Sequence, residues 1–404
     1  MIVAMNVAPN VDIREAPTEA WIAEVRHRFH VEPTVDQELT AKLRNRSQPV
    51  TPLAGLPDIQ RRLTRFLEAT LDREFKLHNL AYLTGGASKE QFVFELEYHD
   101  GTAQTRDKLV LRRDPYEAIT ATYRQREFQL LRAFEGIVPV PTALWLDQAG
   151  EFFGRSSLIC RFVTGVQKPQ SISGNVTGLG ILFPAGTRQR IAEEFVGALA
   201  RIHTADTRNA DLSAFHRPTG TTQAVEMHID WWARVWFEDR LEEVPLMTVA
   251  EHWLRRHVPA LDVVSLVHGD YRSGNFLFDE ATCKITAILD WELAHFGDRH
   301  CDLTWIIFEA FLMRDEQDQM LCCGMLPREE MIALYKAKSG LPVDEDKLHY
   351  YEIFMLWKAV IIVLASAPRV GLGQRTHHDI LVNWLAGIGF VLMDSLRQKL
   401  REVI

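Results

Sequence analysis

Three oxygen-bearing side chains follow one another closely in the second half of the chain. Asp270 comes shortly after an apolar, strand-like run at residues 263–267, and Asn275 and Asp290 lie at the ends of two further short strand-like runs. Phosphoryl transfer from a nucleotide needs hard oxygen ligands that hold magnesium on the phosphates, together with one carboxylate aligned with the attacking hydroxyl. Strand ends that project these side chains to one place would supply that set. The spacing therefore predicts a site for metal-assisted phosphoryl transfer.

Each of these residues taken alone has a commoner interpretation, because Asp and Asn in loops are usually turn or cap formers. The ordered set is more specific: HGDYRSGN at 268–275, AILDWE at 287–292 and GDRHCDL at 297–303. It resembles the catalytic and metal-binding signature of aminoglycoside phosphotransferases, of choline kinases and of the kinase-like domains fused to some acyl-CoA dehydrogenases. The resemblance covers about residues 75 to 390, and the later helices are most similar to the dehydrogenase-associated kinases.

This resemblance implies a role for each residue of the motif. Asp270 is the catalytic aspartate, Asn275 and Asp290 bind Mg²⁺, and His268 braces the loop. Asp302, at the start of an apolar helix, pins the catalytic loop from below. The family implies an α+β, bilobal protein-kinase-like fold with a small antiparallel sheet lobe, one main helix and a larger helical lobe. The implied activity is an ATP- and Mg²⁺-dependent transfer of phosphate to a hydroxyl of a small molecule.

A glycine turn lies upstream at Gly85, Gly86, Ala87 and Ser88 and leads into a strand-like run. A dinucleotide fingerprint or a Walker loop must open a helix, so the context argues against both. A hairpin whose backbone N–H groups lie over the ATP phosphates fits better. A plain hairpin turn is the alternative.

Kinase-like lobes hold the phosphates with a cation on the third strand, and that cation pairs with a helix glutamate. Arg112 aligns with this cation, with Arg113 as the fallback. Glu127 lies on the apolar stripe of the next helical segment, where a buried carboxylate needs a cationic partner. A solvated glutamate at the edge of the stripe is the alternative. The resemblance also places adenine at the hinge, against the Arg161 carbonyl and the Val163 N–H.

The composition of the chain limits the kinds of partner that we expect. The chain has 404 residues, 47% of them hydrophobic, which is enough for two packed lobes, and its net charge of −9 gives no basic excess for nucleic acid. Five scattered cysteines favour a cytoplasmic setting. The apolar run at 353–367 is shorter than the roughly 20 residues of a membrane span, so we expect a core helix. The expected partner is a small-molecule hydroxyl acceptor, without nucleic acid or membrane, and the expected state is a monomer or homodimer.

Changes in the hydrophobic periodicity divide the chain into three regions. Residues 1–70 form a helical extension, 71–163 a nucleotide-binding lobe, and 164–404 a catalytic and acceptor lobe with a helical insertion at 205–262. Two-residue alternation around an Asp-Gly turn predicts a hairpin of strands at 92–98 and 108–112. A helix is predicted at 117–134 and a strand pair at 152–163. Further helices are predicted at 21–29, 39–43, 59–71, 191–203, 223–243, 248–257, 302–321, 328–339, 346–366 and 377–402.

The insertion carries several tryptophans and an acidic run at residues 238–243. Carboxylates there could receive a polycationic aminoglycoside, but a solvated helix face with tryptophans packed beneath is the commoner arrangement, and we favour it. The similarity to dehydrogenase-associated kinases favours a hydroxylated metabolite, such as a hydroxyacyl thioester, as the acceptor.

Two other functions fit part of the pattern. A nucleotide-sensing pseudokinase would keep the fold without the catalysis, yet no catalytic or metal side chain is missing. A metallohydrolase could use His268, Asp270, Asp290 and His295 around a metal-bound water. That scheme gives the spacing of Asn275 no role.

Overall fold

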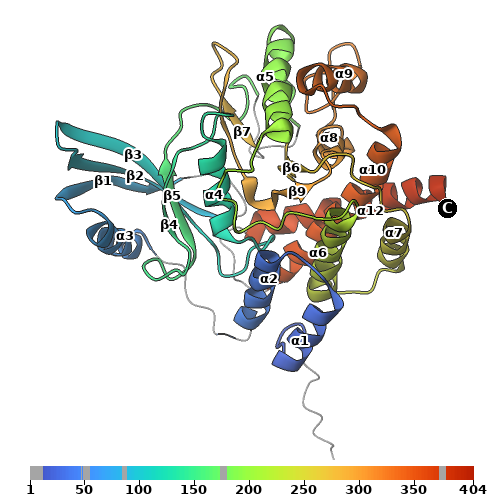
Figure 1. Ribbon diagram of the computed structural model, residues 1–404, viewed down its shortest axis with the longest axis horizontal. Helices are drawn as coiled ribbons and strands as arrows, with labels where there is room; N and C mark the ends of the chain where they lie inside the picture. Colours follow the sequence, from blue (N-terminus) through green and yellow to red (C-terminus); the bar gives the residue numbers. More distant parts are fainter. Residues whose placement is uncertain (1–11, 47, 49–54, 84–88, 173–179, 373–378) are drawn as a thin grey trace, which may run out of the picture.

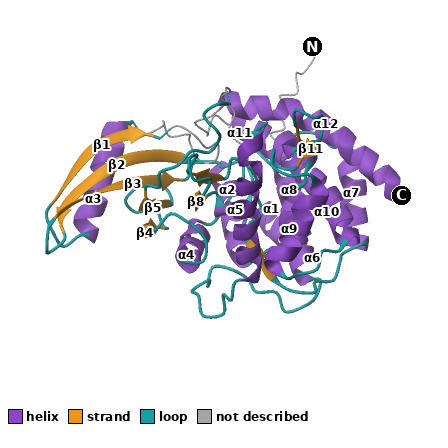
Figure 2. Ribbon diagram, turned by 90° about the horizontal axis from the view of Figure 1, so that it is seen from above, coloured by secondary structure: helices purple, strands orange, loops and turns teal. Residues whose placement is uncertain are grey.

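A five-stranded antiparallel sheet and a larger set of helices lie at opposite ends of the chain's computed structural model (Figures 1 and 2). The structure describes residues 12–46, 48, 55–83, 89–172, 180–372 and 379–404. The strand order is β1-β2-β3-β5-β4. The α+β, bilobal kinase-like fold predicted from the sequence is confirmed. The sheet strands are β1 (Phe75–Tyr82), β2 (Glu90–His99), β3 (Gln104–Arg113), β4 (Ala143–Asp147) and β5 (Ser157–Arg161).

The predicted hairpin is present, and its strands run further than expected. His99 of β2 pairs with Gln104 of β3, and between them the Asp100 carboxylate accepts the N–H groups of Thr102 and Ala103 at 2.8 and 2.9 Å. β1 was not predicted from the sequence, because its burial does not alternate. A register shift between His78 and Ala81, with Asn79 at a φ of 55°, explains the broken pattern.

Two predictions in this lobe are wrong in part. The helix predicted at 117–134 begins only at Arg124 (α4, Arg124–Phe134), because side chains of the preceding loop bond to other segments: Glu117 to Arg46, Thr120 to Glu292. In the predicted strand pair at 152–163, only β5 is a strand. Residues 151–153 form a turn because the Asp147 carboxylate accepts their three N–H groups.

The large lobe is built around one long buried helix, α10. This helix and its continuation, Glu345–Gly371, are long and apolar enough to cross a membrane, but 83% of the most apolar window is buried inside the protein, as in a core helix. The predicted helix at 302–321 is wrong beyond Ile306. The segment continues into a short hairpin of β10 (Met313–Arg314) and β11 (Met320–Leu321), where the Asp315 carboxylate accepts N–H groups of the turn. The other predicted helices are present: α5 (Ala185–Thr204), α6 (Gln223–Asp239), α7 (Pro245–Arg256), α9 (Arg328–Ser339), α10 (Glu345–Ile361) and α12 (Asp379–Val403). The remaining elements are β6 (Ser265–Val267), β7 (Phe276–Phe278), β8 (Ile285–Ile288), η1 (Trp291–Leu293), β9 (His295–Gly297), α8 (His300–Ile306), η2 (Glu309–Phe311), β10 (Met313–Arg314), β11 (Met320–Leu321), η3 (Ile362–Ser366) and α11 (Ala367–Leu372).

The first three helices pack in two different places. α1 (Glu19–Arg28) and α2 (Pro33–Arg46) lie beside α6 in the large lobe, whereas α3 (Leu56–Thr70) covers one face of the sheet (Figure 1). Ile59 and Leu63 of α3 share a buried cluster with Phe92 and Phe94 of β2. The extension therefore contacts both lobes. The boundaries proposed at residues 70 and 163 stay predictions.

Candidate active site

The loop that carries Asp270 is clamped through its backbone. β6 leads into it, and Gly269 adopts a φ of +83°, where an added Cβ would lie 2.4 Å from the Leu293 carbonyl oxygen. The Asp302 carboxylate of α8 accepts the N–H groups of His268 and Gly269 at 2.7 and 2.8 Å. Burial acts to raise the pKa of Asp302, but hydrogen bonds and charge from His203 and His268 outweigh it and lower that pKa. The sequence placed Asp302 beneath this loop, and the structure has it there.

His268 joins the loop to the segment that carries Asp290. Its Nδ1 accepts the Asp270 N–H at 3.3 Å, and its Nε2 lies 3.0 Å from the Leu289 carbonyl oxygen. Burial lowers the pKa of His268, which favours the neutral ring. Because both ring nitrogens bond to the main chain, this histidine braces the loop and has no free nitrogen for a metal. That disfavours the metallohydrolase scheme.

Asn275 and Asp290 meet at adjacent ends of the β7–β8 hairpin. Phe276 pairs with Ile288, and the Leu289 N–H donates to the Asn275 carbonyl at 2.9 Å. The Asn275 side-chain amide donates to the Asp270 carbonyl at 2.9 Å and to its Oδ2 at 2.6 Å. Asp290 is left-handed, with φ 60° and ψ 53°. The structure thus brings together the three residues that the sequence singled out.

Arg112 links the small lobe to this group. Its guanidinium donates to the Glu127 carboxylate and, through Nη2, to Asp290 Oδ1 at 2.9 Å. The structure therefore contains the buried pair of Arg112 and Glu127 that the helical stripe indicated. Arg113, the fallback, bonds to Glu90 instead.

Comparison with known proteins shows the family. The model of the phosphotransferase enzyme family matches residues 80–322. The chain belongs to this family. Mus musculus acyl-CoA dehydrogenase family member 10 is 27% identical over 280 residues, which are 67% of this chain but 25% of the relative. The chain thus spans a quarter of that relative's length.

Solved structures agree on the fold. A Ralstonia eutropha protein assigned as an aminoglycoside phosphotransferase superposes with a TM-score of 0.61 and 22% identity, over 85% of this phosphotransferase and 98% of that chain. Plasmodium vivax ethanolamine kinase gives 0.53 and 13%, over 90% and 96% of the two chains. The resemblance to phosphotransferases and to dehydrogenase-associated domains, stated from the motif, is confirmed.

Two further donors hold the Asp270 carboxylate of the phosphotransferase, and neither was predicted from the sequence. Trp305 Nε1 donates to Oδ1 at 2.7 Å, and Arg272 Nε donates to the same oxygen at 3.0 Å. The Arg272 guanidinium also lies 5.3 Å from the centre of the Phe311 ring. The motif contains Arg272 but gives no direction for its side chain, and Trp305 reaches the loop from α8.

A buried charge cluster that was not predicted lies where Glu292 approaches the small lobe. Lys89 Nζ is 3.2 Å from Asp114 Oδ1 and 3.5 Å from Glu292 Oε2. Arg124 joins Asp114 to Glu127. Lys89 directly follows the glycine turn, whose residues Gly85, Gly86, Ala87 and Ser88 lie outside the described residues.

The segment predicted to be the hinge directly follows β5. The Phe162 N–H donates to the Lys108 carbonyl of β3 at 2.9 Å. Because strand groups alternate, the Arg161 carbonyl and the Val163 N–H face away from β3. The Arg161 guanidinium pairs with Asp107 at 2.6 Å. The contact of these two main-chain groups with adenine stays a prediction.

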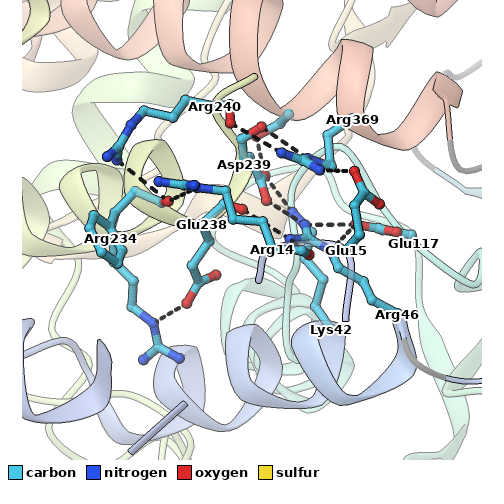
Figure 3. A network of polar contacts seen from close by, with 12 residues as sticks. Arg14, Glu15, Lys42, Arg46, Glu117, Arg234, Glu238, Asp239, Arg240 and Arg369 are labelled. Carbon is cyan, nitrogen blue, oxygen red and sulfur yellow. Dashed lines mark hydrogen bonds and ion pairs between the residues drawn. The ribbon is translucent and has the colours of Figure 1, made fainter. Parts of the chain in front are cut away.

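The acidic run of the insertion is a solvated face only in part, because Glu242 and Glu243 are exposed whereas Glu238 and Asp239 are not. Glu238 and Asp239 are fully buried and bond to Arg234, Lys42 and Arg46, as Figure 3 shows. Both earlier hypotheses are wrong for these two carboxylates, which neither meet solvent nor offer free charge to a polycation. The tryptophans Trp231, Trp232 and Trp236 are buried, as expected.

One group of side chains that could bind a metal ion lies apart from the motif. Ligand atoms of His228, His295 and Cys301 are within 4.8 Å of one another and buried. However, Trp232 Nε1 donates to His228 Nε2 at 3.0 Å, and the charge of Lys358 acts on both His228 and Cys301. A cation beside the group disfavours a second one, so we assign no metal here.

Proposed function

We propose that this phosphotransferase moves the terminal phosphoryl group of ATP to a hydroxyl of a small molecule, with Mg²⁺. The convergence of Asp270, Asn275 and Asp290 beside the Arg112–Glu127 pair supports the proposal. An adenine at the hinge, and phosphates under Gly85–Ser88, would complete the nucleotide site.

The local charges fit a magnesium ion. Burial raises the pKa of Asp290; Arg112 opposes this effect, and the charges of Glu292, Glu127 and Asp270 add to it. A dication beside Asp290 and Asn275 would relieve that repulsion with the oxygen ligands that Mg²⁺ prefers. When bound, Mg²⁺ would neutralise charge on the phosphates.

The protein's own groups divide the remaining work. A carboxylate has about four lone-pair sites. Trp305 and Arg272 occupy Asp270 Oδ1 and Asn275 one site of Oδ2, which leaves Oδ2 to orient the acceptor hydroxyl and take its proton. The Arg272 guanidinium is placed to stabilise negative charge on the transferring group.

A hydroxylated metabolite such as a hydroxyacyl thioester is the proposed acceptor. The name of the mouse relative, an acyl-CoA dehydrogenase family member, supports this class. An aminoglycoside-like compound is less well supported, because Glu238 and Asp239 are already ion-paired. A cytoplasmic location and a monomeric or homodimeric state are also proposals.

Nucleotide binding tests the metal site. Asp290→Ala should weaken Mg·ATP binding at least about tenfold, since one carboxylate ligand is lost. The matched control is Asp279→Ala, because Asp279 only caps the β7–β8 turn through the Thr282 N–H at 2.7 Å. Equal affinity in the two variants, measured by calorimetry with and without Mg²⁺, would refute the metal assignment.

Product formation tests the reaction. Hydroxyacyl-CoAs, aminoglycosides and amino alcohols should be screened for phosphate transfer from labelled ATP, with Asp270→Asn beside the parent. Transfer by the parent and its loss in Asp270→Asn are expected. ATP binding without transfer to any pool would instead favour the pseudokinase alternative.

A further inference from the structure

Lys358 of α10 is a buried cation that pairs with no carboxylate in the part of the chain that the structure describes. Its side chain is fully buried, and no Asp or Glu of the described residues lies within ion-pair distance of its ammonium. The Nζ donates to the Gly269 carbonyl at 2.8 Å and lies 4.8 Å from the Trp305 ring centre and 5.3 Å from the Trp232 ring centre. Burying an ammonium is costly unless fixed groups replace its water. Here a carbonyl and two aromatic faces replace it.

The Gly269 contact completes a two-sided clamp on the catalytic loop. Gly269 donates its N–H to the Asp302 carboxylate at 2.8 Å and offers its carbonyl to Lys358. The Asp302 carboxylate therefore binds the N–H of Gly269, which is partly positive, and the Lys358 ammonium binds its carbonyl oxygen, which is partly negative. Glycine has the widest backbone freedom of any residue. The loop needs a glycine here, at a φ of +83°, so hydrogen bonds to both the N–H and the carbonyl of Gly269 restrict the loop's conformation most. The peptide fixed at the carbonyl side is the one that leads into Asp270.

Trp305 provides a second link between Lys358 and Asp270. Lys358 lies over the face of its ring, and its Nε1 donates to Asp270 Oδ1 at 2.7 Å. A cation over an indole is attracted by the ring's negative face, which restrains the ring orientation. Lys358 therefore reaches both the backbone of Asp270, through Gly269, and its carboxylate, through Trp305.

We propose that Lys358 is a positioning residue that holds the Asp270 carboxylate in the orientation needed for the acceptor hydroxyl. This inference rests on the proposed phosphotransfer. Lys358 touches neither nucleotide nor acceptor in this scheme, and acts only through Gly269 and Trp305.

The test is Lys358→Met, which keeps the length and packing and removes the charge. We expect kcat to fall at least about tenfold and KM for ATP to stay within about twofold. The melting temperature should hold or rise, because replacing a buried charge by a hydrophobic residue is often neutral or stabilising. A residue with only a structural role would lose stability instead.

Lys347→Met is the matched control on the same helix. Lys347 pairs with Asp262 and Asp298 at 3.3 Å each, away from the loop. Its replacement should lower the melting temperature and leave kcat within about twofold. Trp305→Phe, which keeps a ring but removes the N–H, should lower kcat as well. In the double variant with Lys358→Met, the fold-loss in kcat should be smaller than the product of the two single fold-losses, because both residues act on one carboxylate.

An unchanged kcat in Lys358→Met, or a loss shared equally by Lys347→Met, would overturn the proposal. Failure of the proposed function is a different result, in which the parent itself transfers no phosphate. Amide exchange at residues 268–271 gives a readout independent of activity: Lys358→Met should exchange faster there than the parent, and equal exchange would also overturn the proposal.

Discussion

At the scale of single residues, Arg272 has the most exposed side chain among the donors to Asp270. Its side chain is 20% exposed, whereas Trp305 and Asn275 are buried residues. A partly exposed cation beside the carboxylate that we propose to take the hydroxyl proton can shift position as negative charge develops during the reaction. The two buried donors cannot, so they serve to hold the carboxylate.

Arg272→Met should therefore lower kcat by about 10²-fold, the usual cost of removing one group that stabilises transition-state charge. KM for ATP should change little, because Arg272 bonds to Asp270 and to the Ser273 carbonyl and not to the Arg112 pair. Steady-state kinetics measure both. Arg314→Met is the control, since Arg314 lies on the exposed β10–β11 hairpin and pairs with Asp318. Equal kcat in both variants would contradict this role for Arg272.

Residue types in chain order were enough to predict that Asp270, Asn275 and Asp290 lie close together, because one short stretch carries them all. The pairing of Arg112 with Glu127 could also be predicted, because each residue lies on an element with a clear hydrophobic pattern. Lys358 and Lys89 gave no such signal. Their partners come from distant segments, Gly269 for one and Glu292 for the other, and no spacing along the chain encodes such a contact.

At the scale of elements, α2 presents one charged face to the rest of the protein. Glu38, Lys42 and Arg46 follow at intervals of four residues and therefore lie on one side of the helix. Lys42 and Arg46 meet Asp239. Glu38 lies near the Lys89 cluster, and burial together with the charge of Asp114 raises its pKa to about 7, against the pull of Lys89 and Arg124.

The raised pKa of Glu38 predicts a stability that depends on pH. The folded protein keeps this proton up to about pH 7, whereas the unfolded chain loses it near 4.5, so the free energy of unfolding should fall as pH rises between these values. Glu38→Gln removes the titrating group. It should be more stable than the parent above pH 7, and this advantage should vanish below pH 4.5. Urea unfolding across that range measures it.

Glu24→Gln provides the comparison, because Glu24 is exposed on α1. A constant difference between Glu38→Gln and the parent at all pH values would mean that Glu38 ionises as an ordinary surface carboxylate.

Elements were predictable where a period repeats over many residues and not where side chains divert the backbone. α9 lies at the bounds that its apolar stripe predicted. The turns that shortened other elements are set by the Asp147 and Asp315 carboxylates, each capturing neighbouring N–H groups. A pattern of apolar residues does not report such local capture.

At the scale of the whole molecule, Arg46 joins three segments that are distant in the sequence. From α2 it reaches Glu117, in the loop after β3, at 2.8 Å, and Asp239, at the end of α6 (Figure 3). Ser366 and Lys42 also bond to Asp239, and Arg369 binds its carbonyl. The bilobal fold could be predicted from the motif, but this junction could not, because charges this far apart in sequence carry no shared pattern.

Arg46→Met should lower the free energy of unfolding by about 3–5 kcal/mol, the usual cost of leaving a buried charge without its partner. Glu117 and Asp239 are 4% and 0% exposed, so water cannot replace the guanidinium. Arg44→Met on the same helix is the control: Arg44 and its partner Glu19 are 54% and 68% exposed, and such surface pairs contribute about 0–1 kcal/mol. Urea unfolding of the full chain compares them. Should both variants lose equally little, the junction would not hold the extension and the two lobes together.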